Sequence, residues 1–160
     1  MKSFEGQPQN SPELEGLQFT SRHTAEFEDR IYDVGKVIEL AEQIPESEIT
    51  PQSLEKLRDN NYWHDKEGNW LGPHSIIGLY EAANQDWDHM VAKQPGWEDH
   101  IQGVRRADYE KFPIIVVSKG DENHVIDGMH RLTKAWIDKA DKIKAKRFEK
   151  LPDEAIVKSS

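Results

Sequence analysis

Five consecutive residues near the C-terminal end of the chain carry side chains that could do chemistry: Asp127, Gly128, Met129, His130 and Arg131. They follow a short β-prone run at residues 124–126, and from Met129 onward apolar residues recur at helical spacing. A strand that ends at Asp-Gly and continues as a helix exposes the first backbone N–H groups of that helix. Because the helix dipole also favours an anion there, the sequence predicts an anion-binding turn.

Each residue of this turn has a functional and a purely structural interpretation. The guanidinium of Arg131 can hold a phosphate with two donors, or form a surface salt bridge. His130 can donate to a phosphate oxygen or act as a general acid, or simply pack on the strand. Asp127 can cap the helix, or orient His130 or a magnesium-bound water. Gly128 lets a ligand approach the backbone, or only makes a tight turn.

The candidate residues fall into two sets. The candidate catalytic residues are His130 and Asp127, and the candidate cofactor-binding residues are Gly128, Met129, His130 and Arg131. No metal site is predicted. The segment from Asp86 to His89 contains two aspartates and a histidine, but it lacks the spacing of a zinc or calcium motif.

Composition narrows the class of protein. The 160 residues suit one domain, and the absence of cysteine excludes disulfides, thiolate catalysis and cysteine-ligated zinc. No apolar run approaches a membrane span, and the first residues lack the apolar core of a secretion signal, so we expect a cytoplasmic protein. The net charge of −9 argues against non-specific nucleic-acid binding. A small anionic ligand remains compatible with the composition, because basic residues are concentrated after residue 112.

Three elements must position the turn. The apolar run after Phe112 predicts a central strand near 113–118, and a second strand is expected near 123–127. Residues 142–148 alternate with period two and predict a further strand. Its lysines are those of a basic patch or of a protected edge strand, and the second interpretation suits an acidic protein better.

The first half of the chain predicts a polar arm and then helices. Residues 1–28 are polar with isolated apolar residues, which is typical of an arm lying along the domain or a neighbouring subunit, so a homodimer is left open. Asp33 is an expected N-cap for a helix that Pro45 ends, followed by a short strand at 46–50. Further helices are expected from Pro73 and around Trp87. The domain is expected over 29–157.

Residues 62–71 place aromatic side chains on either side of a polar, glycine-containing turn. One interpretation is a hairpin or loop whose aromatic rings cover the edge of the core. The other is an aromatic pocket wall, since ligand rings stack on Trp and Tyr. The sequence does not choose between them.

The order of strand, turn, strand, Asp-Gly-x-His-Arg, helix and strand resembles the ParB/sulfiredoxin superfamily, and within it a group of stand-alone ParB-like proteins. The resemblance is carried by Phe112-Pro113-Ile114-Ile115, by the segment Asp127–Arg131 and by Arg147-Phe148. It extends more weakly over residues 31–150. It implies a single compact α+β domain with a small mixed sheet surrounded by helices. It also implies that the turn at Gly128 holds nucleotide phosphates, with ATP, ADP or CTP and magnesium as candidate cofactors.

The chain departs from the family at Met129. Sulfiredoxins have a nucleophilic cysteine at that place and ParB partition proteins a glutamate, so neither chemistry carries over. A related free-serine kinase is the nearest activity, although there too Met129 replaces a histidine. The resemblance thus implies a nucleotide-dependent phosphotransferase or nucleotide hydrolase, or else a non-catalytic nucleotide sensor. DNA binding is disfavoured by charge and because the helix-turn-helix segment of the partition proteins has no counterpart before Ser160.

Overall fold

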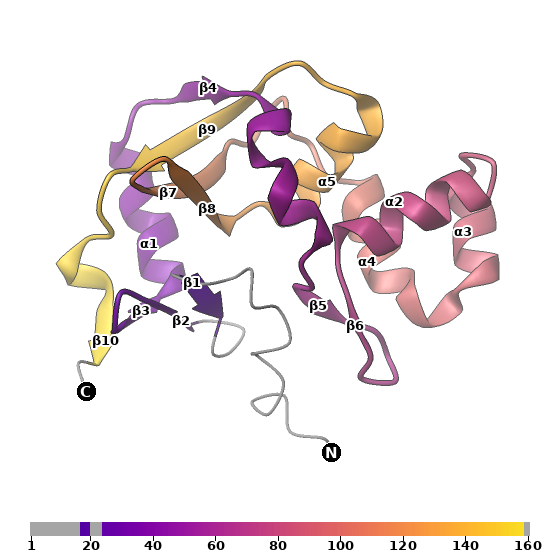
Figure 1. Cartoon of the computed structure of the whole chain (residues 1–160), viewed down its shortest axis with the longest axis horizontal. Helices are drawn as coiled ribbons and strands as arrows, with labels where there is room; N and C mark the ends of the chain where they lie inside the picture. Colours follow the sequence, from indigo (N-terminus) through magenta and orange to yellow (C-terminus); the bar gives the residue numbers. More distant parts are fainter. Residues whose placement is uncertain (1–16, 20–23, 159–160) are drawn as a thin grey trace. The chain divides into compact units, whose positions relative to one another are not determined.

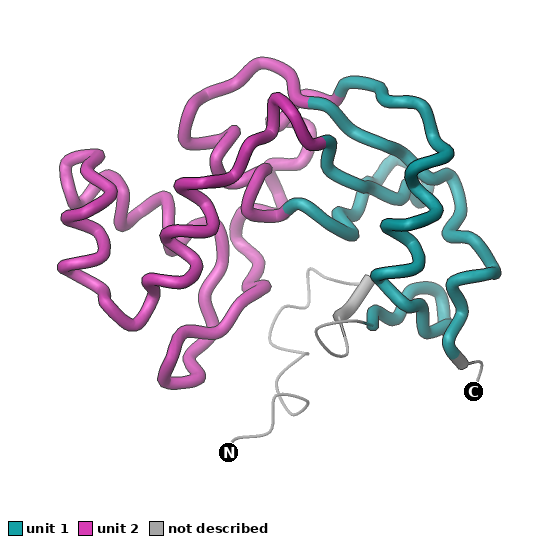
Figure 2. Tube along the Cα trace, turned by 180° about the vertical axis from the view of Figure 1, so that it is seen from behind, with its two compact units in different colours: residues 1–48, 113–128, 144–160 teal, residues 49–112, 129–143 magenta. Residues whose placement is uncertain are grey.

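The computed structural model describes residues 17–19 and 24–158, which form an α+β protein with small sheets. The chain forms two compact units where the sequence predicts one compact domain (Figure 2). Unit 1 comprises residues 1–48, 113–128 and 144–160, and unit 2 comprises residues 49–112 and 129–143. Both units are therefore assembled from separate stretches of sequence, so no linker could mark them.

Unit 1 contains two four-stranded sheets (Figure 1). The first has the order β1-β2-β3-β10 and is built from β1 (Leu17–Phe19), β2 (Thr24–Phe27), β3 (Arg30–Asp33) and β10 (Ile156–Lys158). The second has the order β4-β9-β7-β8 and is built from β4 (Ser47–Ile49), β9 (Ile143–Phe148), β7 (Ile114–Lys119) and β8 (Glu122–Asp127). Strand β7 is antiparallel to β8 and parallel to β9, which confirms the predicted mixed sheet.

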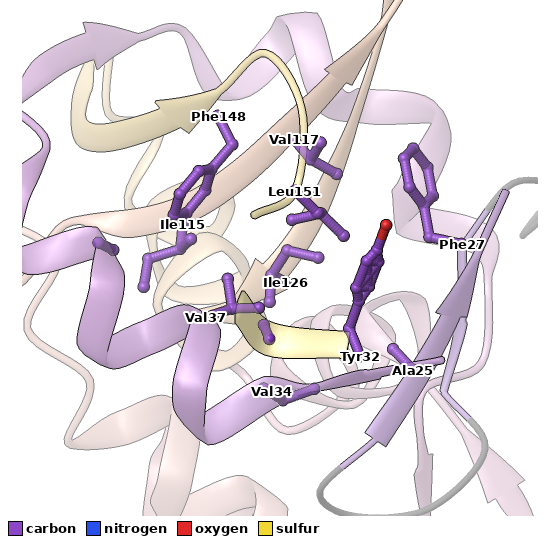
Figure 3. Packing of buried hydrophobic residues seen from close by; sticks show 12 residues of the cluster. Ala25, Phe27, Tyr32, Val34, Val37, Ile115, Val117, Ile126, Phe148 and Leu151 are labelled. Atoms are coloured by element: carbon purple, nitrogen blue, oxygen red, sulfur yellow. The ribbon is translucent and has the colours of Figure 1, made fainter. Parts of the chain in front are cut away.

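Helix α1 (Val34–Leu40) begins where the sequence predicts, because Asp33 Oδ1 accepts a hydrogen bond of 3.1 Å from the backbone N–H of Lys36. The 3-10 turn η4 (Ala41–Gln43) continues it to the residues before Pro45. Buried residues of α1 and the two sheets share one core, in which the side chains point toward one another (Figure 3). Its largest members include Phe27, Tyr32, Ile115, Val117, Ile126, Phe148 and Leu151.

Unit 2 is mostly helical. After the 3-10 helix η5 (Pro51–Asp59) and the hairpin of β5 (Trp63–His64) and β6 (Trp70–Leu71), it contains α2 (Pro73–Ala82), α3 (Trp87–Lys93), η6 (Pro95–Trp97), α4 (Glu98–Arg105) and α5 (Met129–Asp138). Pro73 occupies the first turn of α2, and Asp86 caps α3, where it accepts from the N–H of His89. A core of Leu71, Ile76, Ala83, Met90, Ile101 and Val104 holds the unit together.

Two sequence predictions need correction. Residues 24–28 do not belong to an arm: β2 pairs with β3, and Ala25 and Phe27 alternate into the core. The rest of the predicted arm, apart from β1, lies outside the described residues. Strand β9 is not an edge strand, because β4 lies on its outer side. Its buried residues lie on both faces: Ile143 and Ala145 on one face, and Phe148, at the opposite parity, on the other.

The residues after Pro152 add a short turn and a strand to unit 1. The 3-10 turn η7 (Asp153–Ala155) leads into β10, which pairs antiparallel with β3. Across residues 17–19 and 24–158 no helix has both the length and the apolar character needed to cross a bilayer.

The turn between β2 and β3 offers a test of backbone strain. Glu28 and Asp29 both have positive φ, 54° and 67°, in a two-residue hairpin turn where glycine is favoured. Replacement Asp29→Gly should raise the free energy of unfolding by about 0.5–1 kcal/mol, measured by urea denaturation. The matched change Asp121→Gly lies in the β7–β8 turn, where the positive φ belongs to Gly120, and should bring no gain. Equal effects of the two changes would contradict this explanation.

Candidate functional site

The predicted turn is a direct connection from a strand to a helix. Strand β8 ends at Asp127 and α5 begins at Met129, with only Gly128 between them. Gly128 has φ +108°, a conformation that is strained for any residue with a Cβ atom. The glycine is therefore required by the backbone, which is the tight-turn role that the sequence offered for it. Ligand approach to this glycine stays a prediction.

Helix α5 is fixed within unit 2 along its length. Leu132, Thr133 and Ala135 are fully buried, and Thr133 Oγ1 donates a hydrogen bond of 2.7 Å to the Met129 carbonyl in the first turn. Farther along, the indole N–H of Trp136 donates to the Pro51 carbonyl at 2.9 Å. These contacts hold the helix axis and hence the direction in which its first turn points.

The imidazole of His130 is confined by residues of two other elements. One face stacks on Trp63 of β5, with ring centroids 4.6 Å apart and planes 23° apart. The ring also lies close to Gly103 of α4: a Cβ atom at that position would be 3.1 Å from His130 Cε1 and 3.2 Å from Nδ1. The ring thus occupies a slot that exists because α4 has a glycine where it passes α5.

A second histidine holds the edge of the same ring. His100 of α4 has its Nδ1 3.2 Å from His130 Nε2, and its own Nε2 lies 2.9 Å from the backbone carbonyl oxygen of His64. Trp63 also stacks on His100, with ring centroids 5.1 Å apart. We call Trp63, His100 and His130 the imidazole cluster. Its three residues come from β5, α4 and α5 of unit 2.

The positions of the protons in this cluster follow from which atoms can only accept a hydrogen bond. A carbonyl oxygen only accepts, so His100 Nε2 must carry the proton that it shares with His64. In a neutral His100 the Nδ1 atom is then a lone pair, and His130 Nε2 must donate to it. Neutral His130 therefore keeps its own lone pair on Nδ1. Within the described part of the chain, that Nδ1 has no hydrogen-bond partner.

Electrostatics support the neutral state of the cluster. Burial lowers the pKa of His130 to about 4, and the charges of His100 and Arg131 act in the same direction. Burial also lowers the pKa of His100, although the His64 carbonyl and the carboxylates of Asp99 and Asp65 oppose it. At neutral pH neither imidazole carries a charge, so Arg131 is the cation of the first turn of α5.

The hairpin of β5 and β6 brings Trp63 to the cluster. Its turn is closed by Asp65, whose Oδ1 accepts from the backbone N–H of Asn69 at 2.8 Å and of Glu67 at 2.9 Å. Gly68 supplies the positive φ that the turn needs. The rings of His64 and Trp70 pack on each other across the two strands, with centroids 4.1 Å apart. The hairpin interpretation of residues 62–71 is thus confirmed, and its aromatic side covers His130.

The five sequence-predicted residues lie in one continuous turn, but they have different surroundings. Asp127 pairs with Ile115 in the sheet and is half-buried. Met129 and Arg131 are half-buried in the first turn of α5. His130 points into the imidazole cluster, which leaves it better suited to accept a proton through Nδ1 than to act as a general acid.

Sequence reasoning missed His100 and Gly103. They lie about thirty residues from His130, in a segment whose apolar periodicity predicts only a weak helix. The one signal available was the small residue Gly103 on the helix that also carries His100, because a glycine in a helix interior allows close approach. No pattern of spacing could have joined that helix to the turn.

Two other features of the described residues bear on ligand binding. They contain no group of three or more His, Asp or Glu side chains that could hold a metal ion. An open depression of about 710 Å³ lies over η5 and α2 of unit 2. Its lining is mixed in charge, with Arg58 paired to Glu55 at 3.5 Å, so it presents no single charge to a ligand.

Comparison of the chain with protein-family models, with curated proteins and with solved structures found no match.

The lowered pKa of His130 predicts a loss of stability in mild acid. An unfolded histidine takes up a proton near pH 6.5, whereas the folded His130 does so only near pH 4. The contribution of His130 to the free energy of unfolding is therefore present above about pH 6.5 and is lost as the pH falls toward 4. The loss between pH 7 and pH 5 should be about 2 kcal/mol. Urea denaturation at both pH values should show a smaller loss in His130→Gln than in the wild type.

The matched control for this experiment is His89→Gln, which removes an exposed histidine from α3. It should keep the wild-type pH dependence. If His130→Gln and the wild type lose the same free energy of unfolding between pH 7 and pH 5, His130 does not have the environment described above.

The slot beside Gly103 predicts opposite effects of two similar changes. Alanine stabilises a helix interior by about 1 kcal/mol relative to glycine, and Gly78 of α2 has open space at its Cβ position. Gly78→Ala should therefore raise the urea midpoint. Gly103→Ala should lower it, because its Cβ meets the His130 ring, which is also held by stacking on Trp63. A gain of stability in Gly103→Ala would show that His130 is not confined.

Proposed function

We propose that the protein binds a nucleotide by its phosphates at the first turn of α5, and acts as a phosphotransferase or nucleotide hydrolase on a small molecule. The observation that carries the proposal is the glycine with φ +108° that joins β8 directly to a helix with Arg131 in its first turn. This local arrangement is also the reason for the resemblance to the ParB/sulfiredoxin superfamily, and membership of that superfamily is part of the proposal.

The phosphate-holding groups are the backbone and Arg131. The first N–H groups of α5 have no partners within the helix, and the ten-residue helix supplies a dipole that favours an anion. Arg131 adds two donors of fixed geometry and a positive charge. Gly128 adds no side chain of its own to the backbone before the helix.

Because His130 is neutral, it and Arg131 should have different roles in the turn. An imidazole with a pKa near 4 supplies no positive charge at neutral pH, so it adds little to phosphate affinity. Affinity should therefore depend on Arg131, while His130 is suited to a group that carries a proton, such as a hydroxyl. This division favours an enzyme, because a pure phosphate sensor would gain more from a charged histidine.

A non-catalytic nucleotide sensor is the second candidate. It is favoured by Met129, whose thioether cannot form a phosphoryl intermediate and stands where related proteins have a reactive side chain. The two candidates differ in turnover, because an enzyme releases product from a nucleotide with magnesium and a sensor only binds it.

Arg131→Ala should weaken nucleotide binding by about tenfold to a hundredfold, because a charge-assisted hydrogen bond contributes about 1.5–3 kcal/mol. Binding of ATP, ADP and CTP with magnesium should be measured by calorimetry in a buffer free of phosphate. Arg131→Lys should recover part of the loss, since it keeps the charge but not the two-donor geometry. Arg106→Ala, which removes an exposed arginine just after α4, is the matched control and should bind like the wild type.

If none of these nucleotides binds to the wild type, or if Arg131→Ala and Arg106→Ala bind equally well, the first turn of α5 is not a nucleotide site.

A further inference from the structure

The hydrogen bonds of the imidazole cluster can be arranged in only one order of donors and acceptors when both rings are neutral. Starting from the His64 carbonyl oxygen, the proton lies on His100 Nε2 and the lone pair on His100 Nδ1. The next proton lies on His130 Nε2, and the last lone pair lies on His130 Nδ1. The fixed carbonyl at one end thus determines which atom is the acceptor at the other end.

The packing of the cluster keeps His130 from reversing this order. A ring flip of His130 would have to displace either Trp63, 4.6 Å away by ring centroids, or the backbone at Gly103. A shift of the His130 proton from Nε2 to Nδ1 would leave two lone pairs facing each other across 3.2 Å. Both changes are unfavourable, so the Nδ1 lone pair is maintained without a charged partner.

We propose that His130 Nδ1 accepts the proton of the hydroxyl group that attacks the terminal phosphorus of a bound nucleoside triphosphate, with His100 as the positioning residue. The inference rests on the proposed function, because it takes the nucleotide to lie at the first turn of α5. It assigns the base, which the sequence could not select, and it gives His100 a role that no motif indicated.

The step balances with water or an alcohol as the acceptor. The hydroxyl oxygen forms a bond to the terminal phosphorus while its O–H bond breaks, and the proton moves to His130 Nδ1. The bond from that phosphorus to the diphosphate oxygen breaks, and its electron pair leaves with the nucleoside diphosphate. His130 then carries protons on both nitrogens, keeps its Nε2–H bond to His100, and later releases the Nδ1 proton to solvent.

A bound phosphate is expected to change the pKa of His130. The free imidazole is a weak base, but a phosphate anion next to it favours the protonated form and raises its pKa toward neutrality. The groups that face the cluster from its own elements are His64 and Asp65 on the hairpin, Asp99 on α4 and Arg131 on α5. Arg131 opposes protonation of His130, as does the charge of His100 within the cluster, and a bound phosphate would offset the charge of Arg131.

The test separates binding from turnover in the full chain, with ATP and CTP as probes, magnesium present and water as the acceptor. Nucleotide affinity is measured by calorimetry, and release of the nucleoside diphosphate is followed as a function of pH. In the wild type, kcat should fall on the acid side with the protonation of His130. His130→Gln should lower kcat by about a hundredfold or more with little change in affinity.

His100 is tested with two variants that differ in hydrogen bonding. His100→Leu removes the acceptor for His130 Nε2–H, so kcat should fall and the acid limb of the pH profile should move. His100→Gln can accept from His130 and donate to the His64 carbonyl, so it should restore most of the lost kcat and the original limb. A purely structural role for His100 would leave the limb in place. His89→Gln is the matched surface control and should behave like the wild type.

The outcomes distinguish this inference from the proposed function. Binding without diphosphate release, or equal kcat in the wild type and His130→Gln, overturns the role of His130 and leaves nucleotide binding intact. Equal pH profiles in the wild type and His100→Leu overturn the role of His100. Absence of nucleotide binding removes the proposed function, and this inference with it.

Discussion

The hydrogen bond between His100 and His130 is the interaction on which the candidate site depends. It joins two helices whose sequences are separated by about thirty residues, and its geometry is determined by a backbone carbonyl at one end and a tryptophan face on one side. Without it, His130 would be an ordinary first-turn histidine, free to choose its tautomer. With it, the chain holds a neutral imidazole whose Nδ1 carries a lone pair and can accept a proton.

The rest of unit 2 can be understood as the support of this bond. The hairpin turn closed by Asp65 presents Trp63, and Gly103 lets α4 pass close to the His130 ring. The buried face of α5 and the bond from Trp136 to the Pro51 carbonyl hold the helix that carries His130. Each of these contacts restricts a different motion of the ring, which explains why a small cluster can keep one arrangement of protons.

The sequence predicted the local elements well because their signals are local. Asp33 as an N-cap, Pro73 in the first turn of α2 and the glycine between β8 and α5 each act within a few residues of chain. The predictions from sequence were wrong or incomplete where a structural feature depends on contacts between distant segments. The lysine-containing strand β9 looked like an edge because β4, almost one hundred residues earlier, could not be placed beside it. His100 was overlooked for the same reason, since the slot beside Gly103 exists only once α4 and α5 are packed.

The most direct measurement is the tautomeric state of His130, read from the ring nitrogen resonances of the full chain labelled with ¹⁵N at neutral pH. Resonances can be assigned by their loss in His130→Gln and in His100→Gln. The account predicts a protonated Nε2 and an unprotonated Nδ1 in both His100 and His130, with the His130 Nδ1 resonance moving toward the protonated range when nucleotide binds. A proton on Nδ1 of free His130, or rapid exchange between both tautomers, would contradict it.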